Sequence, residues 1–164
     1  MPKDDEIGAM ILGGIIGAIL AAPKPEEKQE LQQYRNLKTQ ISLRQQRVGV
    51  LPSLSKIMSK PMIHSLFTEA YRTYLFGFFR SSVILSSALL ELLLKEKFGD
   101  KRFFELIELA KKEALINEIE YHFLHGVRLQ RNDAIHNFEK EIREEDALIA
   151  LRIAIDAINK LVGE

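Results

Sequence analysis

Residues 81–94 read SSVILSSALLELLL, and this run decides the fold class. Wound as a helix it is apolar on almost every side, and Glu91 is its single charged residue. A helix that is hydrophobic all round is normally buried inside its domain. Gly99 and Asp100 end the pattern, and Gly is a favoured residue just past a helix C-terminus. We therefore predict an all-α protein with this run as its central helix.

The apolar pattern continues on both sides of this run. From Ser65 to Phe98 it fits one long helix or two helices joined near Gly77. Downstream, apolar residues at helical spacing predict further helices over Phe103–Ala114, from Asn117 to about His136, and from about Glu144 to Val162. No alternating strand pattern competes with them. We expect an up-and-down four-helix bundle with shorter pieces and an additional N-terminal helical and apolar appendage.

Length and composition narrow the class of protein. The chain has 164 residues, enough for one domain with a buried core. Its formal net charge is zero, so attraction to nucleic acid must come from a local patch. It has no cysteine, which excludes disulfides, thiolate zinc sites and a cysteine nucleophile. The absence of cysteine fits a reducing compartment, and we expect a cytoplasmic protein.

An uncharged segment, IGAMILGGIIGAILAA, lies near the N-terminus at residues 7–22. Acids outnumber Lys3 ahead of it, so it lacks the basic start of a secretory signal. Sixteen residues of helix rise about 24 Å, which is short for a bilayer span. Gly13 and Gly17 have the small-xxx-small spacing of closely packed helices. The segment is either a short membrane anchor, which would give membrane association, or a buried or self-associating soluble segment.

A basic stretch follows, because residues 31–68 contain no Asp or Glu. Apolar residues at helical spacing make its first half a helix with a thin apolar stripe. It is either a solvated helix packed lightly on the main domain or a basic arm for RNA phosphates or anionic lipid head groups. We divide the chain into an apolar segment at 1–24, a basic arm at 25–60 and a helical bundle at 61–164. The candidate RNA contacts on the arm are Arg35, Lys38, Arg44 and Arg47.

A polar cluster, QRNDAIHN, occupies residues 130–137. Asn132 and His136 are four residues apart and share a helix face, with Arg128 one turn before them. Arg131 lies about 140° from His136 on an ideal helix, but its long side chain can swing toward that face. The cluster is either a site that handles phosphate and protons or a capped, solvated helix end with a hydrogen-bonded histidine.

The run from Arg131 to His136 resembles the R-polar-x-x-x-H motif of HEPN domains (higher eukaryotes and prokaryotes nucleotide-binding). Two longer stretches are similar to that family's central and final helices, namely FGFFRSSVILSSALLELLLKEKFGD at 76–100 and EEDALIALRIAIDAINKL at 144–161. The resemblance covers about Ser65 to Val162 and leaves residues 1–60 outside. It implies a HEPN-like bundle. Many HEPN proteins are metal-independent endoribonucleases, often toxins or antiviral effectors, and commonly dimerise so that both motifs face one cleft.

The resemblance therefore predicts a ribonuclease active as a homodimer, with RNA as substrate, no cofactor and a cognate antitoxin as a candidate partner. We assign His136 the acid and base role and Arg131 the stabilisation of charge on the phosphoryl group. Asn132 would orient the histidine or the phosphate, and Glu91 would hold Arg131 or His136. Arg128 is a further candidate RNA contact. We expect no metal site. The alternative is a non-catalytic HEPN-like module that binds a nucleotide or a protein partner, with the apolar N-terminal segment as a candidate membrane tether.

Overall fold

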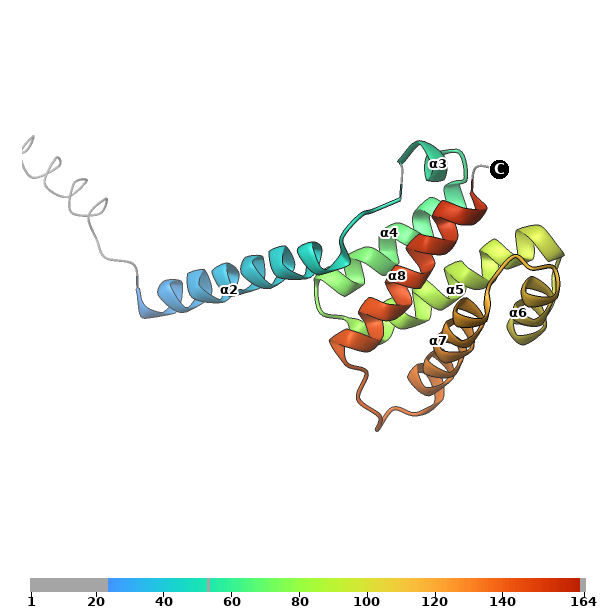
Figure 1. The fold of residues 1–164 in the computed structure, drawn as a ribbon. Helices are drawn as coiled ribbons and strands as arrows, with labels where there is room; N and C mark the ends of the chain where they lie inside the picture. Colours follow the sequence, from blue (N-terminus) through green and yellow to red (C-terminus); the bar gives the residue numbers. More distant parts are fainter. Residues whose placement is uncertain (1–23, 53, 163–164) are drawn as a thin grey trace, which may run out of the picture. The chain divides into compact units, whose positions relative to one another are not determined.

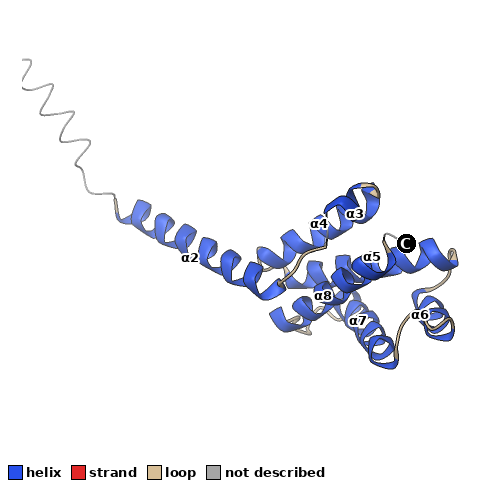
Figure 2. Ribbon diagram, turned by 45° about the horizontal axis from the view of Figure 1, so that its top comes forward, coloured by secondary structure: helices blue, strands red, loops and turns tan. Residues whose placement is uncertain are grey.

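The computed structural model describes residues 24–52 and 54–162. Within these ranges it contains seven helices and no strand, which confirms the all-α class (Figure 2). The helices are α2 (Pro25–Val48), α3 (Leu54–Met58), α4 (Pro61–Leu75), α5 (Phe79–Phe98), α6 (Phe103–Lys112), α7 (Glu118–His136) and α8 (Glu144–Leu161).

The chain divides into two compact units, Met1–Lys38 and Thr39–Glu164. The division falls inside α2. The last turn of α2 belongs to the second unit and contributes to its hydrophobic core, because Val48 is 4% exposed and packs there. Gly49 follows with φ of +81°, a conformation that favours glycine, and α2 ends there.

Helix α5 is the centre of the second unit, because it contacts α4, α6, α7 and α8 (Figure 1). It contains the quoted apolar run, and its leucines Leu89, Leu90 and Leu93 are at most 3% exposed. Buried serines at Ser82, Ser86 and Ser87 leave room for neighbouring helices to approach closely. The prediction that this run forms the central helix is confirmed.

Gly77 explains why the long apolar pattern makes two helices, α4 and α5. Its φ is +84°, and a Cβ placed on it would lie 3.2 Å from Nη1 of Arg44. The same Arg44 nitrogen donates a hydrogen bond to the carbonyl oxygen of Leu75 at 3.0 Å. A side chain at position 77 would therefore strain the backbone and crowd the arginine that closes the turn.

The later helices begin and end close to the predicted residues. The Asn117 side chain caps α7 by accepting from the Glu120 amide at 2.9 Å, and Glu120 accepts from the Asn117 amide at 2.7 Å. Helix α6 ends at Lys112, two residues before the predicted boundary, because Ala114 has a positive φ of 54°. The capping box at Asn117 and Glu120 fixes where α7 starts.

No helix in the described ranges is long and apolar enough to cross a membrane. The apolar segment at residues 7–22, for which an anchor was one interpretation, lies outside the described residues.

Candidate functional site

Arg131 on α7 is anchored to Glu91 on α5. Its Nη1 lies 3.2 Å from Oε2 of Glu91, and the two side chains are 32% and 19% exposed. The second oxygen of Glu91 binds Nζ of Lys95 at 3.1 Å. Arg131 Nε is buried and has no hydrogen-bond partner among the described residues. The structure thus brings together two of the predicted residues and leaves part of the guanidinium facing solvent.

His136 is the last residue of α7, and its side chain is exposed. No hydrogen bond or ion pair joins its ring to any residue in the described ranges. Asn132, one turn earlier, is exposed as well. No hydrogen bond joins Arg131 to His136, and five residues of helix separate them by about 7.5 Å along its axis. The imidazole is therefore open to solvent.

The loop that follows His136 is held by Arg80, which sequence reasoning did not single out. From the first turn of α5, its Nη1 donates to the Ala134 carbonyl at 2.7 Å and to the Asn137 carbonyl at 3.3 Å. Its Nη2 donates to the carbonyls of Phe138 at 3.4 Å and Lys140 at 2.6 Å. Across the same loop Lys140 forms an ion pair with Asp133. One guanidinium thereby fixes the backbone on both sides of His136.

A signal for Arg80 was present in the sequence. It is the one cation between Arg72 and Lys95, directly before the most apolar run of the chain. A cation at the start of a buried helix needs several acceptors, because a charge removed from water is costly unless it is hydrogen-bonded.

Comparison with known proteins places these residues within a family. A family model described as a domain of unknown function (DUF4145) matches residues 68–163, more than half of the chain. The chain belongs to the DUF4145 family. No curated protein and no solved structure matches it. The DUF4145 region contains Arg80, Glu91, Arg131 and His136, and it excludes all of α2.

Arg128, a predicted RNA contact, lies on α7 within the DUF4145 region. Its guanidinium carbon is 5.7 Å from the centre of the Phe104 ring on α6, a cation–π contact. Its Nε is buried and has no partner in the described part of the chain. Arg128 therefore packs between two helices of the domain, and contact with RNA stays a prediction.

Arg44 and Arg47, two predicted RNA contacts on α2, lie against the start of α8. Arg44 Nε is 3.3 Å from Oε2 of Glu144, and Arg47 binds both Glu144 and Glu145. Tyr74 also donates its hydroxyl to Glu144 at 3.3 Å. Burial, together with the Glu144 charge, raises the pKa of Tyr74 to about 12. The two arginine charges are thus matched by acids of the DUF4145 region, and their contact with RNA is untested.

The other two candidates on α2, Arg35 and Lys38, belong to the unit formed by residues 1–38 and are exposed. Their contact with RNA is also untested.

Two of the three histidines outside the motif, His122 and His125, have side-chain partners. His125 Nε2 lies 3.3 Å from Glu108, and its ring stacks edge-on against Tyr121 at 4.5 Å. His122 pairs with Glu118, one turn before it. Across the described residues, no three side chains of His, Asp or Glu are grouped so that they could hold a metal.

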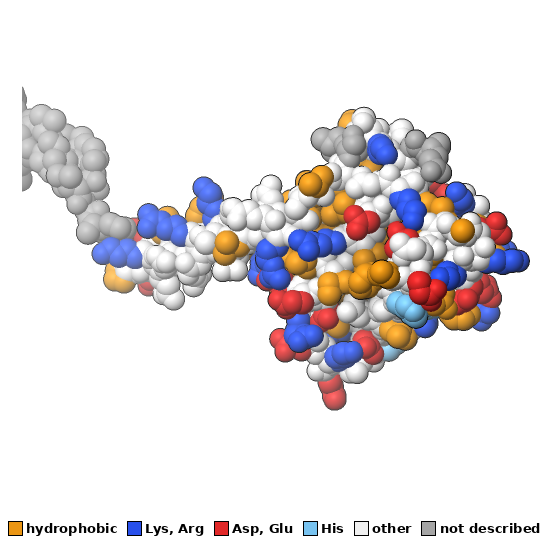
Figure 3. All heavy atoms as spheres, viewed as in Figure 1, with side chains coloured by type: hydrophobic (Ala, Val, Ile, Leu, Met, Phe, Trp, Pro, Cys, Tyr) orange, Lys and Arg blue, Asp and Glu red, His pale blue; other side chains and the backbone are white. Residues whose placement is uncertain are grey.

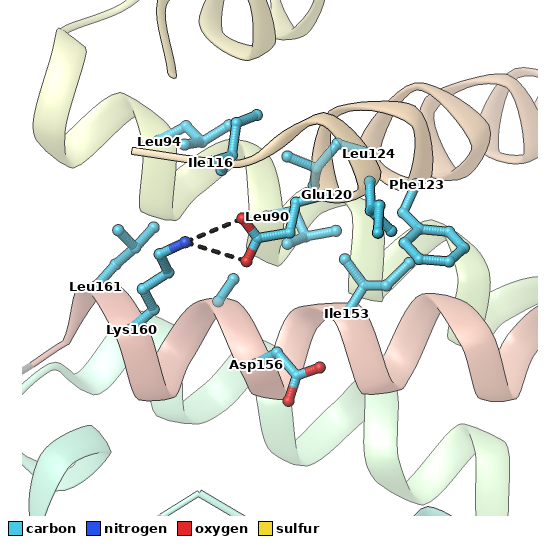
Figure 4. Close-up of a pocket in the computed structure, with 12 residues that line it drawn as sticks. Leu90, Leu94, Ile116, Glu120, Phe123, Leu124, Ile153, Asp156, Lys160 and Leu161 are labelled. Atoms are coloured by element: carbon cyan, nitrogen blue, oxygen red, sulfur yellow. Dashed lines mark hydrogen bonds and ion pairs between the residues drawn. The ribbon is translucent and has the colours of Figure 1, made fainter. Parts of the chain in front are cut away.

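An apolar groove lies at the other end of α7, between α7 and α8 with α5 as its floor (Figure 4). Ile119 and Phe123 on its α7 side are 67% and 50% exposed. Figure 3 shows hydrophobic side chains gathered on the face that carries α7 and α8. Lys160 binds both oxygens of Glu120 at 3.0 Å across one end, and Asp156 stands at the rim. The groove contains none of the motif residues.

Proposed function

We propose that this DUF4145 protein is a metal-independent endoribonuclease of the HEPN type. In this proposal α4, α5, α7 and α8 form the up-and-down four-helix bundle of that family, with α2 and α3 as additions. The resemblance between Arg131 and His136 and the HEPN motif supports it. So do the all-α fold and the position of the motif at an exposed helix end.

The observation that carries the proposal is the contrast between the two motif side chains. Arg131 is held by Glu91 on the central helix, whereas His136 is exposed and makes no hydrogen bond within the described residues. An anchored guanidinium can stabilise charge on a phosphoryl group at little entropic cost. An imidazole that makes no hydrogen bond within the protein can act as a base or an acid toward a ligand. A solvated helix end with a hydrogen-bonded histidine would lack this contrast.

The chemistry needs no nucleophile from the protein, because RNA supplies its own 2′-hydroxyl. One His136 takes the proton of the 2′-hydroxyl while the 2′-oxygen forms a bond to phosphorus. The bond from phosphorus to the 5′-oxygen breaks, and an imidazolium gives that oxygen its proton. Arg131 stabilises the added negative charge, and Asn132 orients the phosphate or the ring. The products are a 2′,3′-cyclic phosphate and a 5′-hydroxyl.

This mechanism calls for two copies of the chain. In-line displacement needs a base on one side of phosphorus and an acid on the other, and each chain offers one His136 at the motif. A two-fold axis would bring two such residues to one composite groove. The same proposal makes the protein a cytoplasmic toxin or defence effector, restrained by an antitoxin. Attachment to a membrane through residues 7–22 would be a further property of the protein, which the ribonuclease activity does not require.

RNA cleavage in EDTA tests the activity. Full-length protein is incubated with a single-stranded RNA, and the products are examined for cyclic phosphate ends. We expect cleavage that His136→Ala abolishes. His122→Ala is the matched control, since His122 is an exposed histidine of the same helix outside the motif. No cleavage by the unaltered protein, or equal cleavage by both variants, would reject the ribonuclease.

Mixing variants tests the shared site. Adding His136→Ala protein to unaltered protein should form hybrid dimers that hold one catalytic histidine. At equal amounts, the activity per unaltered chain should fall to about half, because half of those chains are then in hybrids. Activity that does not change with added variant would mean that one chain cleaves alone.

The apolar groove favours a second candidate function, a non-catalytic module that binds a protein partner. Exposed Ile119 and Phe123 suit an amphipathic helix laid between α7 and α8. Lys160 is already paired with Glu120, so the remaining charge at the rim is that of Asp156, and the helix should carry a cation. A protein with this function would leave RNA intact in the EDTA experiment.

A further inference from the structure

The first part of α2 carries a stripe of exposed apolar side chains. Leu31, Tyr34 and Leu37 are 46%, 64% and 42% exposed. Steps of three residues advance about 300° around a helix, so these side chains share a face about 120° wide. All three lie in the unit formed by residues 1–38. Three exposed apolar side chains on one helix face differ from single exposed apolar residues, because they match the contact face of a paired helix. Glu30 and Lys38 lie on the same face, about 40° on either side of Tyr34.

The opposite face of the same segment is polar. Asn36 lies two residues from Tyr34, about 200° around the helix. Its Oδ1 accepts a hydrogen bond from Nε2 of Gln32 at 3.0 Å. The segment can therefore bury one face against one partner and keep its other face in water.

The charges of α2 identify the partner. Acids predominate at its start, as Glu26, Glu27 and Glu30 with Lys28 among them, and bases follow at Arg35 and Lys38. Arg44 and Arg47, further along α2, are already paired with Glu144 and Glu145 and take no part. Such a helix complements its own copy when the two run antiparallel, because the acidic start of each then lies beside the basic part of the other. A parallel pair would place acid beside acid and base beside base, which is unfavourable.

We propose that the α2 helices of two chains pair antiparallel through this stripe, with the two-fold axis at Tyr34. Glu30 and Lys38 are equally far from Tyr34 along the chain, as are Leu31 and Leu37. Each Glu30 is then level with Lys38 of the other copy, and each Leu31 is level with Leu37. The contact is isologous and closes with two chains. It is a partner surface distinct from the motif and does not depend on the ribonuclease.

Few side chains take part, so we expect a weak dimer whose population depends on protein concentration. It nevertheless holds two DUF4145 regions at a high local concentration. Sedimentation equilibrium of the full-length chain, from low micromolar to near-millimolar concentration and without RNA, measures it. Glu30→Lys and Lys38→Glu each place like charges level in both halves of the interface. Each single variant should raise the dimer dissociation constant about 3- to 10-fold.

The double variant with both reversals makes the test specific. It restores both Glu–Lys pairs, so its dissociation constant should return to that of the unaltered chain. Tyr34→Glu, at the axis, should raise the constant at least tenfold. Asn36→Lys is the control on the polar face and should leave the constant unchanged.

A chain that stays monomeric throughout would overturn the pairing. A dimer whose dissociation constant is the same in Tyr34→Glu would also overturn it. That result is expected if the two chains associate through residues outside α2, or if the stripe on α2 binds a lipid surface instead of a second chain. A double variant weaker than both single variants would contradict the antiparallel register. A dimer that persists in Tyr34→Glu rejects the α2 pairing and leaves the two-chain ribonuclease standing. Loss of cleavage without loss of the dimer rejects the ribonuclease alone.

Discussion

Arg131 and Glu91 stand forty positions apart in the chain, yet their side chains meet between α7 and α5 at 3.2 Å. The carboxylate is on the central helix, and the guanidinium is five residues before the exposed His136. The pair therefore connects the rigid core of the domain to the one polar cluster that resembles a catalytic motif. Glu91 acts, in the proposed ribonuclease, as a positioning residue for Arg131.

Glu91→Gln tests this role. The amide keeps the shape of the side chain but removes the charge that holds the guanidinium. We expect kcat for RNA cleavage to fall about 10- to 100-fold while KM changes little, since small displacements of a catalytic group have effects of this size. Steady-state cleavage kinetics with thermal unfolding of the same samples provide the measurement.

Glu96→Gln is the matched control for this experiment. Glu96 is an exposed acid of the same helix that pairs with Lys60, away from the motif. Its variant should cleave like the unaltered protein. If Glu91→Gln also retains full kcat, the pair is structural only.

Arg80 gives a prediction about stability. Replacing it by Ala removes donors from one carbonyl at the end of α7 and from three in the loop after it. The free energy of unfolding should fall by about 2–3 kcal/mol, given the strength of hydrogen bonds to charged groups. Arg80→Lys should recover only part of this, because an ammonium lacks the planar fork. Urea unfolding measures the change, and limited proteolysis reports opening of residues 137–143.

An exposed arginine on the neighbouring helix provides the comparison. Arg72→Ala should change the free energy of unfolding by less than about 0.5 kcal/mol, as is usual for surface positions. Arg80→Ala with equally small effects on stability and proteolysis would show that the loop is held by other contacts.

How far the sequence alone leads can be judged from particular residues. The burial of Leu89 and the ends of α7 followed from local patterns, since periodicity and capping act within a few residues. Gly77 could be placed at a joint, but one helix or two remained open until its positive φ was known. The contacts of Arg80 depend on loop carbonyls up to 60 residues away, which no local pattern encodes. Arg44 and Arg47 likewise gave no sequence signal of pairing with Glu144 and Glu145, about a hundred residues on.

Tyr74 predicts how stability depends on alkaline pH. Its pKa is raised from 10.0 to about 12 by burial and by the Glu144 charge, so the folded state retains a proton that the unfolded state releases earlier. This contribution to stability is fully present below pH 10 and is lost as the pH rises toward 12. In Tyr74→Phe it is absent, and stability should fall less steeply between pH 10 and 12 than in the unaltered protein.

Urea unfolding at a series of pH values measures this difference. Tyr34→Phe serves as the control, since that tyrosine is exposed on α2 and should leave the slope unchanged. Parallel slopes for Tyr74→Phe and the unaltered protein would mean that the Tyr74 hydroxyl does not sense the folded environment.

Replacing two buried serines of α5 by alanine should change the free energy of unfolding in opposite directions. Ser82 donates from Oγ to the Ala70 carbonyl at 3.0 Å, whereas Ser87 Oγ is buried with no partner in the described ranges. Ser82→Ala should lower the free energy of unfolding by about 0.5–1 kcal/mol, the usual net value of one hydrogen bond. Ser87→Ala should raise it by about 0.5–1.5 kcal/mol, because Ala removes an unsatisfied hydroxyl and favours the helix.

Urea unfolding of the two variants side by side separates these effects, since both make the same chemical change on one buried helix. Equal losses in both would show that Ser87 is hydrogen-bonded in solution, through water or a second chain. A gain confined to Ser87→Ala would show that its hydroxyl is tolerated for its small size, which lets a neighbouring helix lie close to α5.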